Sequence, residues 1–561
     1  MSQLIYHLLQ SLTAMYSARS MAAMPFLMAI AYMAYYYNKR YRSPLASAPL
    51  APAEHFLVKY FGLVPPPSDT EKVDTLSRFL IRVGQDASLS PISVCWSITG
   101  TPLVIVNTLK GIKDVLIDGQ AKSKVKDEPS KVQRGNLIRL IQNLVFGGKS
   151  LNNVVGEEWR WRRHILLPPF QPKQLVPKLL PYVASRASAL LKVFEEQSET
   201  GEAIELDNLF MDMTMDVINY YLYGRSDLNY DLVGDRRNLK NEHHRLGLGF
   251  MSVEAWLPFG INKTDWAQRT YKPARDLLKS FIKDSLVYAL EDYKRDVKEY
   301  EEQGIPEKQR SYRSVAACAF ASGRYGEDQV DLINDLLSLT FAGYDTTAHT
   351  LAFAFSELAR NPALQDELFS QVRQVLGPSP VAPESVTAEK LARMPLVTAI
   401  YRETLRKYPA VVFIPVHVNR DTVVDGAIVP GGAEIWCNVR GVQMNPDIFP
   451  DPDKFDPTRW LRPEDKMADG TSDNAFDNLT TSSNSHVTIT PETQYNFPDL
   501  SFTLGQHACI GKNLAILELR TVIACTMNQF SCTLKKDSVI DTKIVLTTKP
   551  RHGVWVHFKK R

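Results

Sequence analysis

A single cysteine near the C-terminus, Cys509, stands between Gly505 and Gly511 in the stretch "GQHACIG", and a helix-like run, "KNLAILELR", follows it directly. Glycines let a loop approach a sulfur atom closely, so that backbone N–H groups can reach it. The positive end of the following helix favours a thiolate over a thiol. These features indicate a metal-bound thiolate, although a lone cysteine in such a turn is more often a small buried residue.

A carboxyl group and a hydroxyl group interrupt the long apolar helical run over residues 328–361, at Asp345 and Thr346 in "AGYDTT". Gly343 in the same run costs a helix about 1 kcal/mol relative to alanine. A helix accepts this combination where something must fit against it. The alternative is a kinked helix with polar groups on its surface.

Two further pairs have the spacing of a shared helix face. Glu403 and Arg406 are three residues apart in "YRETLRK", and Trp159 and Arg163 are four apart in "EEWRWRR". Residues at these spacings can face one partner. An arginine also matches a carboxylate in charge and in fork geometry. In isolation, however, both pairs are more typical of solvated helix surfaces.

Together these residues resemble the sequence pattern of the cytochrome P450 superfamily. Phe502, Gly505, Cys509 and Gly511 match its haem-binding loop, and His507 stands where that family usually has arginine. The segment "FPDPDKFDPTRW" precedes the loop as it does in the family. The matching segments keep the family's order over residues 156–511, and the resemblance extends to nearly the whole chain.

The resemblance implies a haem site. Cys509 is expected to be the axial ligand of the iron of haem b, braced by the loop residues around it. Trp159 and Arg163 are expected to hold a haem propionate. His507 can still reach a propionate, but it offers a weaker contact than the usual arginine.

The resemblance also implies roles on the two sides of the haem. Asp345 and Thr346 are expected to relay protons on the distal side. Glu403 and Arg406, completed by Arg459, are expected to form a buried charge network that fixes the proximal side of the core.

The elements that must position these residues are mostly helical. Apolar residues recur at helical spacing over 175–197 and 328–361. We therefore expect a mainly α chain with small β-sheets, and the resemblance implies the cytochrome P450 fold. The strand-like pieces are few and short: 102–107, 421–439, with the hairpin signal Asp425-Gly426, and 553–558. The polar stretch 463–494 is expected to be a surface insertion.

The N-terminal region predicts a membrane anchor. Residues 20–38 carry no charge, and Lys39, Arg40 and Arg42 follow directly. Such a run can just span a bilayer as a single helix, with the basic cluster in the cytosol. A cleaved signal peptide is disfavoured because the basic flank comes after the apolar run.

The domain boundaries follow from this anchor. We expect an anchor over 1–42, a proline-rich hinge over 43–53, and a catalytic domain over 54–561 on the cytosolic side of the endoplasmic reticulum.

Composition limits the other classes of function. The 561 residues, 44% of them hydrophobic, suffice for a large core. A net charge of +3 is too small to indicate binding to nucleic acid. The six cysteines contain no CxxC pair, so a structural zinc site is not expected.

The resemblance implies a monooxygenase that oxidises a lipophilic small molecule with O2. The chain shows no nucleotide-binding glycine pattern, so a separate membrane-bound NADPH–cytochrome P450 reductase is expected to supply electrons. Likeness to fungal members favours secondary metabolism, on terpenoid, polyketide or alkaloid scaffolds. A fatty-acid or alkane hydroxylase is one alternative. A haem-thiolate isomerase or dehydratase, which does not use O2, is another.

Overall fold

The computed structural model describes residues 18–50, 90–96, 101–121, 130–225, 234–251, 260–462 and 493–561. Residues 1–17 of the predicted anchor, 51–53 of the hinge and 463–492 of the polar insertion lie outside these ranges. Within the described part of the chain, helices predominate and the strands form small sheets, which confirms the predicted fold class.

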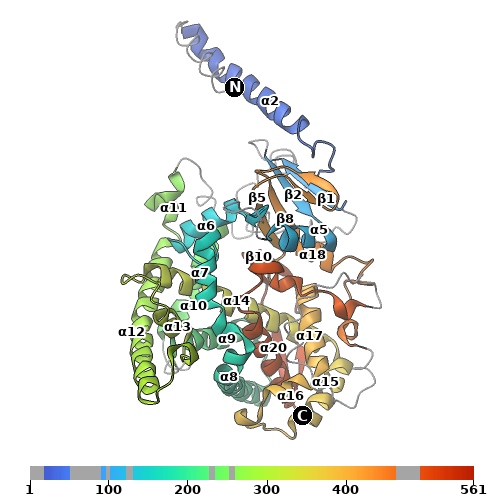
Figure 1. Cartoon of the computed structure of the whole chain (residues 1–561). Helices are drawn as coiled ribbons and strands as arrows, with labels where there is room; N and C mark the ends of the chain where they lie inside the picture. Colours follow the sequence, from blue (N-terminus) through green and yellow to red (C-terminus); the bar gives the residue numbers. More distant parts are fainter. Residues whose placement is uncertain are drawn as a thin grey trace.

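The body is organised around α14 (Val330–Arg360), a helix of 31 residues close to the predicted run 328–361. It passes through the middle of the molecule, and α9 (Leu206–Tyr223) packs along it (Figure 1). The close approach depends on Gly343, where a Cβ atom would lie 2.7 Å from a side-chain carbon of Ile218 on α9. The glycine that interrupts the apolar run therefore serves helix packing.

The remaining helices cover α14 or connect it to the sheets. α8 (Pro172–Thr200) contains the predicted run 175–197 and packs against α20 (Lys512–Met527). The others are α5 (Leu109–Lys113), α6 (Asn136–Phe146), α7 (Gly156–Leu166), α10 (Gly234–Met251), α11 (Asp265–Gln268), α12 (Lys272–Glu302), α13 (Val315–Ala321), α15 (Pro362–Leu376), α16 (Ala388–Ala392), α17 (Pro395–Lys407) and α18 (Val439–Gln443).

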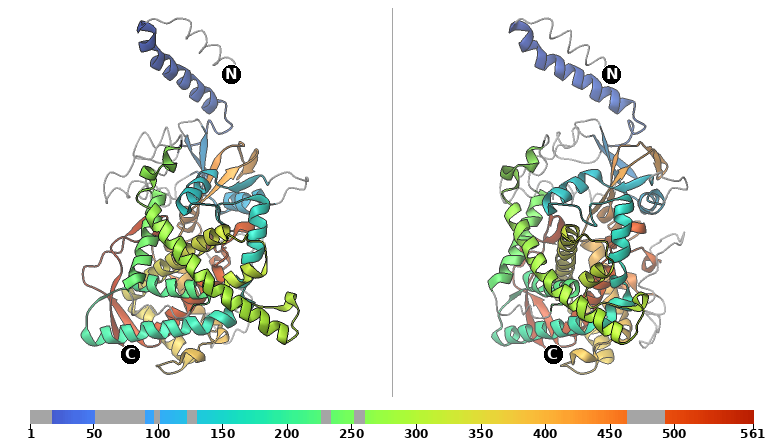
Figure 2. Two further views of the ribbon diagram at one scale, coloured as in Figure 1. Left: turned by 90° about the vertical axis from the view of Figure 1, so that its left-hand side faces the viewer. Right: turned by 60° about the vertical axis from the view of Figure 1, so that its left-hand side comes forward.

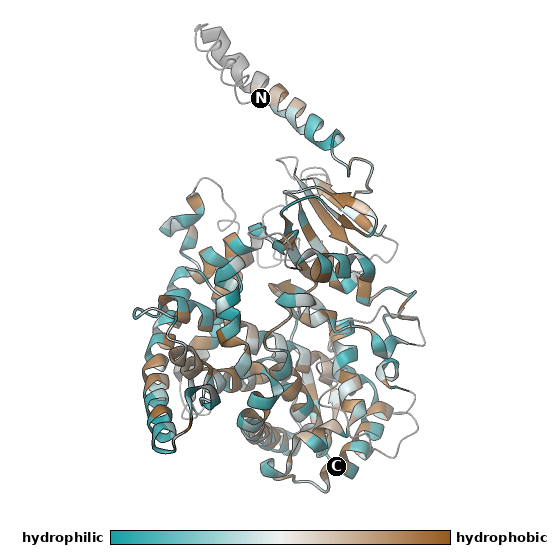
Figure 3. Cartoon of the chain, in the orientation of Figure 1, coloured by the Kyte–Doolittle hydropathy of each residue, from teal (hydrophilic) through white to brown (hydrophobic). Residues whose placement is uncertain are grey.

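The largest sheet has five strands. In spatial order they are β1 (Ile92–Trp96), β2 (Pro102–Val106), β8 (Glu434–Asn438), β5 (Phe413–Val418) and β3 (Val132–Arg134). β2 and β8 run parallel and the other neighbours are antiparallel. Three consecutive residues of β2, 104–106, are fully buried, so both faces of this strand are covered. The sheet is largely hydrophobic in Figure 3.

Three smaller sheets complete the β structure. They are β4 (Ile204–Glu205) with β12 (Trp555–Lys560) and β9 (Phe530–Leu534); β10 (Thr542–Val545) with β11 (Thr547–Pro550); and β6 (Thr422–Val424) with β7 (Ala427–Val429). The last pair is the predicted hairpin, and its turn residues Asp425 and Gly426 both have positive φ, 48° and 84°. The longer segment 421–439 also supplies β8, which joins the five-stranded sheet instead of the hairpin.

The N-terminal helix α2 (Ala18–Tyr41) projects from the body in all views, at the end opposite the C-terminus (Figures 1 and 2). Its last turns touch the five-stranded sheet, where Arg40 lies 5.8 Å from the ring centre of Trp96. Among the residues that the structure describes, no helix is both long enough and apolar enough to cross a membrane. The membrane span predicted over 20–38 therefore stays a prediction.

Candidate functional site

Cys509 lies in the short loop between a 3-10 turn, Gly505–His507, and α20. Its backbone N–H donates to the carbonyl of Phe502 at 2.8 Å, which closes the loop. All six cysteines fall in the described ranges, and Cys509 alone is exposed. Cys318 is half-buried and the other four are buried. This loop therefore presents the most exposed of the six cysteines.

The surroundings of the Cys509 thiol are those of a group that faces an internal space. The side chain has accessible surface, yet burial among protein atoms raises its pKa above the ordinary value. The backbone N–H groups of Gly511 and Lys512 and the charges of Arg163 and Lys512 act in the opposite direction. A bound metal ion would lower the pKa of the thiol further, because a thiol that coordinates a metal ion is deprotonated.

Gly505 and Gly511 serve the loop in different ways. Gly505 has a φ of +71°, and a Cβ atom there would lie 2.1 Å from the carbonyl oxygen of Leu116. Leu116 belongs to η1, a π-helical turn (Asp114–Gly119) against which the loop rests. Gly511 has an ordinary φ of −87°, and its contribution is the N–H that reaches the sulfur. Only Gly505 is therefore required by backbone conformation.

Trp159, Arg163 and His507 meet beside this loop. The rings of Trp159 and His507 have centroids 4.0 Å apart, and Arg163 donates to the carbonyl of Ala508 at 2.8 Å. α7 is held in place by Arg162, whose guanidinium lies 2.9 Å from Asp335 on α14. The Trp159 Nε1 and His507 Nδ1 atoms are buried and have no hydrogen-bond partner among the described residues.

A second arginine, Arg134 at the end of β3, completes this group and was missed in the sequence. Burial lowers the pKa of Arg134 to about 10, and the nearby charge of Arg163 adds to that effect. Burial, together with the charges of both arginines, lowers the pKa of His507 to about 3, so its ring is neutral. Within the described ranges, neither arginine is ion-paired with an aspartate or glutamate. We call Arg134, Trp159, Arg163 and His507 the basic cluster.

The polar residues in the middle of α14 are not hydrogen-bonded to each other. The Thr346 hydroxyl donates to the carbonyl of Ala342 at 2.9 Å, and Ala342 is exposed although most of the helix is buried. The Asp345 carboxylate instead accepts hydrogen bonds from His349, at 3.2 Å, and from the Thr547 hydroxyl on β11. The expected relay pair is therefore separated, with Thr346 on the accessible face and Asp345 on the buried one.

The predicted charge network of Glu403, Arg406 and Arg459 comes together in the core. Glu403 receives two hydrogen bonds from Arg406, both 2.8 Å, and one each from the Trp460 indole and the Asp456 backbone N–H, both 2.9 Å. The Arg459 Nε atom lies 3.4 Å from the same carboxylate. Every oxygen of this buried acid is thus satisfied, as a buried charge requires.

Comparison with known proteins identifies the family. The family model described as Cytochrome P450 matches residues 91–555, most of the chain. The chain belongs to the cytochrome P450 family. Cytochrome P450 4X1 of Rattus norvegicus is 25% identical over 422 residues, which cover 74% of this chain and 76% of the relative. Cytochrome P450 4A10 of Mus musculus is 26% identical over 420 residues, covering 72% and 73%.

The family implies a haem with a cysteine thiolate ligand, and the residues of this P450 fit that group. Cys509 offers an accessible sulfur, and the basic cluster offers two positive charges without an acidic partner. The two carboxylates of haem would supply the missing negative charge. They would also give the unpaired nitrogens of Trp159 and His507 a neighbour to bond. The protein is thus a haem-thiolate monooxygenase of the P450 class.

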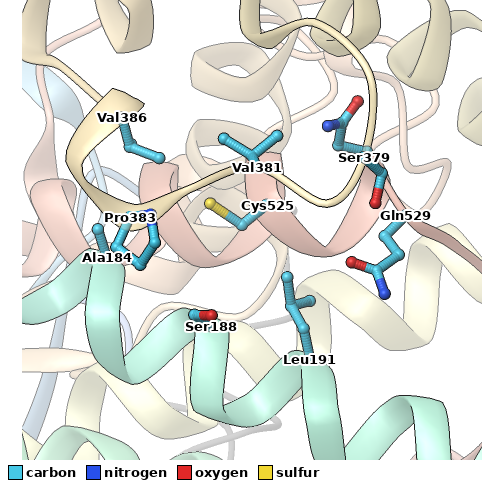
Figure 4. Close-up of a pocket in the computed structure, with 10 residues that line it drawn as sticks. Ala184, Ser188, Leu191, Ser379, Val381, Pro383, Val386, Cys525 and Gln529 are labelled. Carbon is cyan, nitrogen blue, oxygen red and sulfur yellow. The ribbon is translucent and has the colours of Figure 1, made fainter.

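A small hollow between α8 and α20 is unrelated to this site. Cys525, Ser188 and Leu191 line it, together with the loop that carries Val381 (Figure 4). Cys525 lies near the C-terminal end of α20, whereas Cys509 precedes its N-terminal end.

Proposed function

We propose that this P450 hydroxylates or otherwise oxidises a lipophilic small molecule, with electrons from a separate NADPH–cytochrome P450 reductase. The observation that carries the proposal is the basic cluster beside the accessible Cys509 thiol, because two half-buried arginines with no acidic partner among the described residues favour an anionic group between them.

Each residue of the site has a task in that reaction. When bound, haem activates O2, and its thiolate ligand favours cleavage of the O–O bond. Cys509 would hold the iron, while Arg134 and Arg163 would hold the propionates and so orient the ring. Thr346 holds a hydroxyl on the accessible face of α14, where it can pass a proton to a bound ligand once it turns from the Ala342 carbonyl.

We also propose a membrane location. The predicted anchor, residues 1–42, would place the catalytic domain, 54–561, on the cytosolic side of the endoplasmic reticulum. The hinge 43–53 would allow it to move, and 463–494 would be a surface insertion. Support comes from α2, which stands apart from the body and ends with Lys39 and Arg40 in its last turn. A lipophilic substrate would reach the enzyme through the bilayer.

The substrate class is tested by metabolite profiling of a strain that lacks the gene, with purified enzyme and reductase as confirmation. We expect a terpenoid, polyketide or alkaloid intermediate to accumulate. Accumulation of a fatty acid or alkane would instead show the hydroxylase alternative. Turnover that continues without NADPH and O2 would show an isomerase or dehydratase and overturn the proposal.

A further inference from the structure

His349, one helical turn after Asp345 on α14, is bound by two acids. It is 1% exposed. Its Nδ1 atom lies 2.6 Å from Oδ1 of Asp207 on α9, and its Nε2 atom lies 3.2 Å from Oδ1 of Asp345. A carboxylate can only accept a hydrogen bond, so two carboxylate partners require both ring nitrogens to donate. His349 is therefore an imidazolium in the core of the protein.

The charges around the ring agree with this geometry. Burial lowers the pKa of His349, but Asp207 and Asp345 outweigh burial and raise the pKa to about 10. Burial raises the pKa of Asp345, but the charge and hydrogen bond of His349, with the Thr547 hydroxyl, hold it below the ordinary value. The two groups thus keep each other charged across the neutral pH range.

The other titratable groups that face this ion pair come from three elements. Lys549 of β11 acts on Asp345 and Asp207, and its Nζ atom lies 3.3 Å from Nδ1 of His244 on α10. Lys543 of β10 acts on Lys549 and His244. His243 and His244 both have a pKa lowered to about 4, chiefly by burial, so they are neutral. These groups add positive charge and no further acid.

The consequence for Asp345 is a fixed orientation. One carboxylate oxygen is held by His349 and the other by Thr547, which turns the group toward α9 and β11. Thr346, the next residue, bonds to its own helix and not to Asp345. An Asp345 side chain that is to serve the Thr346 side of α14 must first leave this arrangement.

We propose that His349 is a positioning residue that, together with Asp207, holds Asp345 as an anion on the buried face of α14 and so controls when Asp345 can take part in proton delivery. The proposal rests on the monooxygenase function above. It assigns a role to Asp207 of α9, which contacts His349 although the two residues are 142 positions apart in the sequence.

The first test measures thermal unfolding of the full-length haem protein between pH 6 and pH 10. A histidine whose pKa is raised on folding stabilises the protein fully below its unfolded value of about 6.5, and this contribution is lost as the pH rises toward about 10. The difference in unfolding midpoint between wild type and His349→Gln should therefore be largest near pH 6.5 and shrink toward pH 10. A difference that is equal at every pH would overturn the proposal.

Variants of Asp207 sharpen this test. Asp207→Asn removes one of the two carboxylates, so the pH at which stability falls should move down by at least one unit. Asp207→Glu keeps the charge and should keep the wild-type curve. The matched control is Asp216→Asn, which removes another buried acid of α9, paired with Arg186 at 3.2 Å. That variant should lower the midpoint without moving the curve along the pH axis.

The second test measures peroxide released per NADPH consumed, with reductase and with dodecanoic acid as the probe. The wild-type ratio should be flat between pH 6.5 and pH 8.5, whereas in Asp207→Asn it should change about threefold or more, a small part of what positioned proton transfer contributes. A flat ratio in Asp207→Asn would leave His349 with a structural role only and overturn the proposal. If dodecanoic acid is not oxidised, only the fatty-acid alternative is weakened, and the unfolding curves decide the role of His349.

Discussion

The basic cluster is half-buried and the Asp207–His349–Asp345 group is buried, and the two differ in the balance of their charges. The basic cluster contains two arginines and, among the described residues, no acidic partner. The group on α9 and α14 surrounds one imidazolium with two carboxylates and a threonine hydroxyl. Burying an unpaired charge costs much more than burying a paired one. The basic cluster, which lacks an acidic partner among the described residues, is therefore suited to bind an anionic ligand. The Asp207–His349–Asp345 group, whose charges are paired, is suited to hold its own side chains in position.

The largest effect is expected from a substitution of Cys509, the proposed ligand of the iron. Cys509→Ala should abolish the thiolate-type absorption of the ferrous–CO complex. No other cysteine lies in this loop, and none of the other five is exposed. Cys525→Ala is the control, since that cysteine is buried near the far end of α20. An unchanged Cys509→Ala spectrum would mean that another residue holds the iron and that the basic cluster does not lie beside the haem site.

The next effect tests the imbalance directly. Arg163→Ala and Arg134→Ala should each weaken haem retention, because a hydrogen bond to a charged group is worth about 1.5–3 kcal/mol, or about 10- to 150-fold in affinity. His507→Ala should cost less, because its ring is neutral. The measurement is the rate of haem transfer to an acceptor protein.

Arg160→Ala on the same helix is the control for these variants, because its side chain is exposed and pairs only with Glu157 among the charged residues described. Loss of haem from His507→Ala but not from the arginine variants would reverse the ranking and contradict the propionate assignment.

A smaller effect concerns the accessible face of α14. Thr346→Ala should leave haem content unchanged and raise peroxide released per NADPH by about tenfold, since a positioned proton donor contributes roughly a hundredfold or more. Thr350→Ala, one turn further and bonded to the Thr346 carbonyl at 2.8 Å, should leave the ratio near wild type. Equal ratios in wild type and Thr346→Ala would remove this hydroxyl from the reaction.

The smallest expected effect on either cluster comes from deleting residues 1–42. Both clusters lie in the body, and, among the described residues, α2 contacts the body only through its last turns. Haem content and the pH dependence of unfolding should match those of the full chain, while the fraction of protein that sediments with membranes should fall. Loss of haem on truncation would mean that the N-terminal segment belongs to the core.

The sequence predicted best what is local. The Cys509 loop, the 425–426 hairpin and α14 each depend on neighbouring residues, and each lies where the pattern indicated. Arg134 was missed because it ends a strand of three residues whose partner, β5, is almost 300 positions away. The partner of Asp345 was within reach, since His349 has the i, i+4 spacing of a helix pair. Asp207 was not, because only the packing of α9 on α14 brings it to His349.

The contact between Gly505 and η1 has a consequence for biosynthesis. The Cys509 loop rests on residues made long before it: Gln506 donates to the carbonyl of Gln120, 386 positions earlier. At a synthesis rate of about 5–20 residues per second, roughly 20–80 seconds separate the two halves of this contact on the ribosome. Until the Cys509 loop is synthesised, η1 lacks the partner against which it packs. Contacts between residues so far apart in the sequence also form slowly. Haem capture by Cys509 would therefore belong to the last stage of synthesis, and a chain cut short before Cys509 would leave the ribosome without the thiol that is to hold the iron.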